Sequence, residues 1–246
     1  DSKWISNRAD INSDSAAGSF YEVHLGTWKV PKVNDGDEVK KYSYKEIAPL
    51  LADYVKEMGY THIQLLPIME YADEESLGYN VTGYYEPTSR YGSTKDFMFF
   101  MNYMHEQGIG VIIDWNPAFF GNEEFALEKF DGKCLYEHED PKNGIHPEFG
   151  TNLYNYGQPQ VTNFLIANAM FWVEKFHVDG IRIGNLGTML YSDYKRKPGE
   201  WIPNMYGGNE NLEGIEFIKH LNSMMKKKHP DVVIIANDEV KFDKFT

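Results

Sequence analysis

Residues 176–191, FHVDGIRIGNLGTMLY, decide the fold of this chain. The run from Asp179 to Gly184 predicts a turn at Gly180 that leads into a short buried strand. Arg182 falls near the carboxyl end of this strand, and in α/β proteins that end carries the ligand site. A buried arginine needs an anion beside it, because an unpaired charge out of water is costly. The sequence therefore predicts either a structural ion pair or a ligand site at Arg182.

Strands and helices are expected to alternate along the chain. Strands are expected at 19–26, 61–68, 109–117 and 231–237, and helices at 43–58, 93–107, 158–176 and 209–228. Alternation with long loops after the strands is typical of a parallel β/α barrel. The predicted fold class is α/β, a (β/α)8 TIM-barrel-like domain truncated after the fifth strand. Residues 1–18 are predicted to be a linker or N-terminal arm, and residues 19–246 the partial barrel.

Composition narrows the classes of function. The chain has 246 residues, 42% of them hydrophobic and 15% aromatic, as expected for one folded domain with a sizeable core. Its formal net charge of -13 argues against a nucleic-acid partner. Since neither a membrane-length apolar run nor a basic-then-apolar leader occurs, no membrane contact and a cytoplasmic location are expected. Cys134 is the only cysteine, which excludes an internal disulfide.

Two sequence features that resemble cofactor motifs do not fit them. The run 137–140, together with His146, contains candidate metal ligands, but the spacing matches no standard zinc pattern. Gly108 and Gly110 precede the strand that a dinucleotide fingerprint would follow. No metal and no cofactor are therefore expected.

Seven segments of the sequence resemble those of one known family. They are YEVHLGTW (21–28), LLPIME (65–70), GYNVTGYYEPTSRYG (78–92), DWNPAFF (114–120), LYEHEDP (135–141), DGIRIGNLGTMLY (179–191) and EWIPNMYGGNENLEGIEF (200–217). Together they resemble the bacterial glycogen (1,4-alpha-glucan) branching enzymes, transglycosylases of the α-amylase family of glycoside hydrolases. The resemblance implies a barrel that cleaves an α-1,4-glucan, holds it covalently on an aspartate and transfers it to a 6-hydroxyl.

This sequence departs from the family pattern at the reacting positions. Branching chemistry needs two carboxyl groups, one to protonate the leaving oxygen and one to attack the anomeric carbon. By the resemblance, Gly184 occupies the nucleophile position, Asn237 the general-acid position and Phe119 a histidine position. Glycine has no nucleophilic side chain, and loss of the acid alone is expected to cost about 10²–10⁴-fold. No catalytic residue is therefore expected to be intact.

Other family positions are kept or have possible substitutes. The resemblance places Tyr79, Asp114, Trp115 and Arg182 in the sugar site, which predicts weak, millimolar α-glucan binding. Carboxylates at 238–239 follow the fifth strand and would be candidates for a displaced acid, but they do not replace the nucleophile.

Three hypotheses about function stay open. The first is a branching-enzyme homologue that is catalytically impaired or inactive but retains α-glucan binding. The second is a non-catalytic scaffold or interaction protein, in which a protein partner or self-association covers the open barrel edges. The third is an engineered or fragment form of the enzyme.

Overall fold

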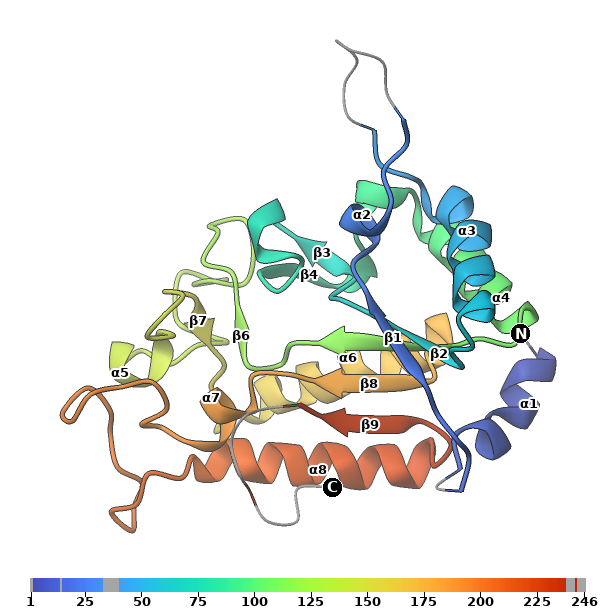
Figure 1. Cartoon of the computed structure of the whole chain (residues 1–246). Helices are drawn as coiled ribbons and strands as arrows, with labels where there is room; N and C mark the ends of the chain where they lie inside the picture. Colours follow the sequence, from blue (N-terminus) through green and yellow to red (C-terminus); the bar gives the residue numbers. More distant parts are fainter. Residues whose placement is uncertain (1, 14, 33–39, 238–241, 243–246) are drawn as a thin grey trace.

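A five-stranded parallel sheet forms the centre of the molecule. The computed structural model describes residues 2–13, 15–32, 40–237 and 242. Within them the strands pair in the order β1-β2-β5-β8-β9 (Figure 1). They are β1 (Phe20–Val23), β2 (His62–Leu65), β5 (Gly110–Trp115), β8 (Gly180–Ile183) and β9 (Val233–Ala236). The predicted partial β/α barrel is confirmed, because every neighbouring pair is parallel and helices connect the strands.

Four long helices connect the strands. They are α3 (Tyr44–Glu57), α4 (Thr94–Glu106), α6 (Pro159–Phe176) and α8 (Leu212–Lys228). A capping box of Ser43 with Glu46 starts α3, and Ser93 with Asp96 starts α4 in the same way. Buried side chains of these helices share one hydrophobic core with alternate strand residues such as Ile63. The other strand face is left for polar groups.

The polar strand face is the inner face of the partial barrel. Gln64 on β2, Asp114 on β5 and Arg182 on β8 alternate with residues of the hydrophobic core. Asp114 and Arg182 are direct cross-strand partners at the carboxyl ends of β5 and β8. Strand pairing therefore brings together two of the predicted site residues.

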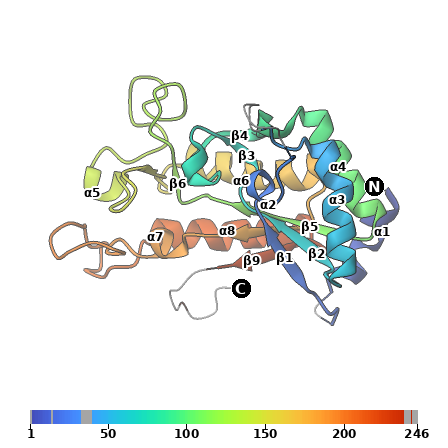
Figure 2. The same ribbon diagram turned by 45° about the horizontal axis from the view of Figure 1, so that its top comes forward.

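Loops that were expected to be irregular contain short paired segments. β3 (Met69–Tyr71) pairs antiparallel with β4 (Val81–Pro87), and β6 (Phe119–Phe120) with β7 (Asn152–Leu153). The remaining short helices are α2 (Leu25–Trp28), η1 (Glu74–Ser76), η2 (Ser89–Tyr91), α5 (Pro141–Gly144) and α7 (Leu186–Leu190). Figures 1 and 2 place α5, β6, β7 and α7 on the side toward which β5, β8 and β9 point. These segments surround the carboxyl ends of the strands.

The amino-terminal segment, expected to be a linker or arm, is helical and attached to the sheet. Helix α1 (Ser2–Ile11) lies on the side away from the loop excursions (Figure 2). Its Trp4 ring stacks on His105 with centroids 4.9 Å apart, and Arg8 forms an ion pair with Asp231 at 2.6 Å. The sequence did not indicate this helix because its buried contacts are mostly polar. No helix in the described ranges combines the length and apolarity that crossing a membrane requires.

Asp179 joins α1, α4 and two strands at the amino ends of the sheet. Its buried carboxylate accepts hydrogen bonds from Trp4 Nε1 at 2.7 Å and Val111 N at 2.8 Å. It also contacts His105 Nε2 at 2.9 Å, and both side chains are fully buried. Asp179, which directly precedes β8, therefore has a structural role at the amino end of the sheet, opposite the end where Arg182 lies.

We expect Asp179→Asn to lower the free energy of unfolding by about 3 kcal/mol, because an amide NH₂ would face donors that now share a carboxylate. Chemical denaturation measures this loss. The matched control is Asp10→Asn on the exposed face of α1, which should change stability by less than about 0.5 kcal/mol. Equal effects of the two substitutions would contradict the anchoring role.

Candidate functional site

A large cavity lies at the carboxyl ends of the strands, where α/β barrels carry their ligand sites. It is an open cleft of about 1080 Å³. Six of the residues named from the sequence line it: Tyr79, Phe119, His146, Arg182, Gly184 and Asn237. Typical small-molecule pockets measure about 300–1,000 Å³, so this cleft has room for an extended ligand.

A buried ion pair forms the floor of the cleft. Arg182 Nη1 lies 2.6 Å from Asp114 Oδ2, and the Tyr79 hydroxyl donates to the same oxygen at 2.6 Å. Gln64 Nε2 donates to Asp114 Oδ1 at 3.0 Å and to Glu22 at 2.9 Å. The ion pair that was one of two explanations for Arg182 is therefore present, and it lies within the site. Asp114 holds Arg182 and Tyr79 in position rather than facing the cleft itself.

The environment of Asp114 shifts its protonation. Burial raises the pKa of Asp114 from its usual value of 3.8 to about 6, although Tyr79 and Arg182 favour the charged form. Burial and the nearby Asp114 carboxylate raise the pKa of Tyr79, so its hydroxyl stays protonated and donates. The floor thus presents a neutral phenol and a cation.

The three substituted positions differ in their surroundings. Gly184 is half-buried, and a Cβ added there would meet no atom within 4 Å. Asn237 is exposed, and its backbone N–H donates to Ile183 O at 3.0 Å. Phe119 is buried, with its ring centroid 5.3 Å from that of His146. The candidate carboxylates at 238–239 lie outside the described residues.

Trp115 is not brought to the cleft. Its side chain is 1% exposed, and its Nε1 donates to Asn168 Oδ1 of α6 at 2.8 Å. Strand alternation explains this position, since the residue after Asp114 must point to the opposite face of the sheet. The structure therefore groups Tyr79, Asp114 and Arg182, and leaves Trp115 in the core.

An aromatic wall was missed by the sequence analysis. His146 stacks on Phe149 with centroids 4.5 Å apart, and both residues line the cleft. His146 Nδ1 accepts the backbone N–H groups of Glu148 and Phe149, which leaves Nε2–H to donate to Thr188 Oγ1 at 3.3 Å. Burial lowers the pKa of His146 to about 4, so the ring is neutral. The sequence predicts His146 only as a candidate metal ligand, and no motif marks Phe149.

Across the ranges that the structure describes, no group of three His, Cys, Asp or Glu side chains is placed to hold an ion.

The Asp114 pKa predicts a specific pH dependence of stability. Because the folded-state pKa is raised, the folded state binds more protons than the unfolded state between about pH 4 and pH 6. The free energy of unfolding, relative to Asp114→Asn, should therefore fall by on the order of 3 kcal/mol as pH rises through this window. Denaturation of both proteins across the pH range measures it. A difference that stays flat or rises would contradict the burial argument.

Comparisons with known proteins agree with this fold. The family described as "Alpha amylase, catalytic domain" matches residues 46–142. The 1,4-alpha-glucan branching enzyme GlgB of Hydrogenovibrio crunogenus is 50% identical over 242 residues, which are 98% of this chain and 33% of that protein. GlgB of Cellvibrio japonicus is 47% identical over 246 residues, 100% of this chain and 33% of that protein. This chain thus spans about a third of the length of these relatives.

A solved structure shows the same fold at low identity. The α-amylase of Geobacillus thermoleovorans, complexed with acarbose, superposes with a TM-score of 0.62 at 18% identity, covering 91% of this chain and 47% of that chain. From its sequence this chain resembles the 1,4-alpha-glucan branching enzymes GlgB, and its fold is that of an α-amylase catalytic barrel, of which five parallel strands lie within the described residues.

Proposed function

We propose that this chain is a branching-enzyme homologue that binds α-glucan in the cleft and does not carry out retaining transfer. The observation that carries the proposal is the pair of residues that follow β8 and β9, Gly184 and Asn237. Retaining transfer needs one carboxylate to attack and one carboxylic acid to protonate. A glycine and an amide supply neither group.

Glucan binding is supported by the cleft floor. Arg182 has five N–H donors, and its Nη1 donates to Asp114 Oδ2 at 2.6 Å. The remaining donors, together with the aromatic faces of Tyr79 and Phe149, suit the hydroxyls and the apolar faces of sugar rings. Because Asp114 fixes both Arg182 and Tyr79, little side-chain freedom is lost when a ligand binds.

Several carboxylates at the cleft already make other contacts. Asp114 accepts from Tyr79, Gln64 and Arg182, so an attacking role would break the cleft floor. Asp73, Glu75 and Glu148 also line the cleft. Glu148 pairs with Lys195 at 3.4 Å, and Asp73 accepts from Ser76 N at 2.8 Å.

The scaffold hypothesis remains the second candidate, and the edge strands favour it. Phe20 on β1 is 45% exposed, and all four residues of β9 are partly exposed. An open apolar edge is a place where a partner chain or a second copy would dock. Sedimentation analysis separates the hypotheses, since a strict monomer at every concentration, with no partner, counts against the scaffold.

We expect saturable heat when a linear maltooligosaccharide is titrated into the protein by calorimetry, with a dissociation constant in the millimolar range. Arg182→Ala should abolish the heat, and Tyr79→Phe should weaken binding about tenfold, since it removes one hydroxyl from the floor. Tyr85→Phe is the matched control, because its hydroxyl bonds Phe164 O outside the cleft. Absence of heat for the unaltered protein would contradict glucan binding.

No new α-1,6 linkages should form when amylose is incubated with the protein and its products are examined by NMR. Any branching would contradict the proposal. Branching that the Glu239→Gln or Asp238→Asn substitution abolishes would show that a carboxylate at 238–239 is needed, and branching that persists in both variants would show that it is not.

Gly184 should tolerate a side chain, which would show that the fold does not impose the glycine. Because an added Cβ meets nothing within 4 Å and φ is not in the left-handed region, Gly184→Ala should change stability by less than about 1 kcal/mol. The control is Gly180→Ala, whose Cβ would lie 3.0 Å from Ile112 Cγ1 and 3.0 Å from Val233 O, and which should cost about 1–3 kcal/mol. Thermal unfolding of both variants measures these changes, and a large loss of stability in Gly184→Ala would contradict this expectation.

A further inference from the structure

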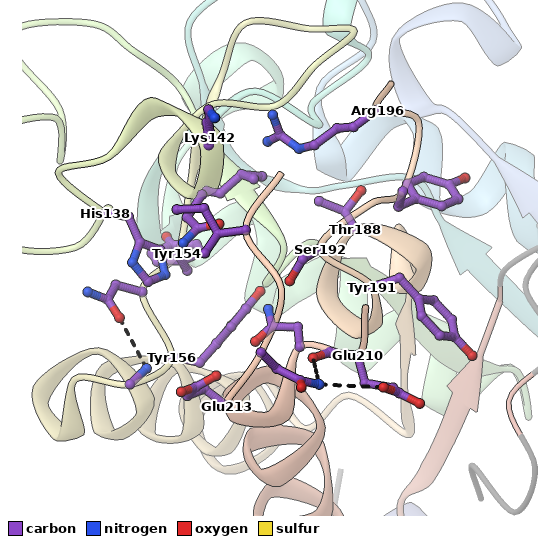
Figure 3. A pocket seen from close by; sticks show the side chains of 18 of the residues that line it. His138, Lys142, Tyr154, Tyr156, Thr188, Tyr191, Ser192, Arg196, Glu210 and Glu213 are labelled. Atoms are coloured by element: carbon purple, nitrogen blue, oxygen red, sulfur yellow. Dashed lines mark hydrogen bonds between the residues drawn. The ribbon is translucent and has the colours of Figure 1, made fainter. Parts of the chain in front are cut away.

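A second cavity, of about 280 Å³, lies beside the cleft. Its walls come from the excursion between β5 and α6 and from the segment between α7 and the start of α8 (Figure 3). Thr188 and Tyr194 line both this pocket and the cleft, so the two hollows adjoin across α7. Its volume is just below the range of about 300–1,000 Å³ typical of small-molecule sites. The pocket therefore has room for one small ligand and not for a chain.

Charge is divided between the ends of the pocket. Figure 3 shows Lys142 and Arg196 at one end, and Glu210 and Glu213 at the other. Two cations alone would favour an anion, but the two carboxylates oppose one. The balance favours a neutral ligand that has both donors and acceptors.

Three pocket side chains have unused hydrogen-bonding capacity. In the part of the chain that the structure describes, His138, Ser192 and Glu213 make no side-chain hydrogen bond. Burial lowers the pKa of His138, so its ring is neutral and offers one donor and one acceptor. His138 and Ser192 are half-buried and Glu213 is exposed, so a ligand that carries hydroxyl groups would replace water at all three side chains.

An aromatic side chain completes the pocket and is held rigidly. The Tyr156 ring stacks on Phe217 with centroids 5.1 Å apart at 18°, and its hydroxyl donates to Pro117 O at 2.7 Å. Such a fixed ring provides an apolar contact surface at low entropic cost.

We propose that this pocket binds one pyranose ring, either a free monosaccharide or the terminal unit of a glucan. A pyranose is neutral, carries hydroxyls that both donate and accept, and has apolar C–H faces. Glu213 would accept from ring hydroxyls, Ser192 and His138 would each donate and accept, and Tyr156 would contact a C–H face. Because none of these four residues lines the cleft, this site is separate from the one in the proposed function.

The test titrates glucose into the protein by saturation-transfer NMR and calorimetry, with and without Arg182→Ala to disable the cleft. We expect saturable glucose binding that survives Arg182→Ala and weakens about tenfold in Glu213→Gln and in Ser192→Ala. The matched control is Glu216→Gln, which removes the same charge from an exposed position on the same helix and should leave binding unchanged.

The outcomes distinguish a free monosaccharide from the terminal unit of a glucan, and binding in the pocket from binding in the cleft. Maltotriose that competes with glucose in the Arg182→Ala protein identifies a terminal glucan unit, and maltotriose that does not compete identifies a free monosaccharide. Unfolding curves check that each variant is folded. If Glu213→Gln does not fold, Ser192→Ala tests the pocket in its place. No saturable glucose signal, or a signal unchanged in both pocket variants, overturns the proposal. Loss of cleft binding alone contradicts only the proposed function.

Discussion

The cross-strand ion pair between Asp114 and Arg182 is the interaction on which the site depends. Parallel pairing of β5 with β8 places the two residues opposite each other, and burial makes each charge require the other. Tyr79 is bound to the same carboxylate, so a residue of the first long loop is fixed to the end of the sheet. One buried carboxylate thereby sets the positions of the groups that we propose bind a sugar.

Residues at the two ends of β8 have different roles, although they lie close together in the sequence. Asp179 ties α1 and α4 to the amino end of the sheet, while Arg182 serves the cleft at the carboxyl end. Between them, Gly180 is required because β9 and β5 approach its backbone closely, whereas Gly184 has open space around it. We propose that only the second glycine stands where the family has a reacting group. Packing therefore requires a glycine at position 180, whereas at position 184 it leaves room for a Cβ atom.

Much of the fold could be predicted because strand and helix signals were local. The capping residues at Ser43 and the buried strand around Ile112 are examples. Helix α1 and the β6–β7 pair were not predictable, since their stability comes from contacts with residues far along the chain, such as Trp4 with Asp179. Side chains alternate between the two faces of β5, so an inward-facing Asp114 excludes its neighbour Trp115 from the site. The wall of His146 and Phe149 had no local periodicity to reveal it, because an irregular loop positions both rings.

The central claim is that the cleft keeps a sugar-binding floor without a nucleophile. Its most direct test is intact-protein mass spectrometry after incubation with a 5-fluoro-α-glucosyl fluoride, which traps the covalent intermediate of retaining enzymes on their nucleophilic carboxylate. A retaining α-amylase serves as the positive control. The account predicts that the mass of this protein stays unchanged while the control gains one fluoroglucosyl group. A stoichiometric mass gain located on any carboxylate of this chain would contradict it.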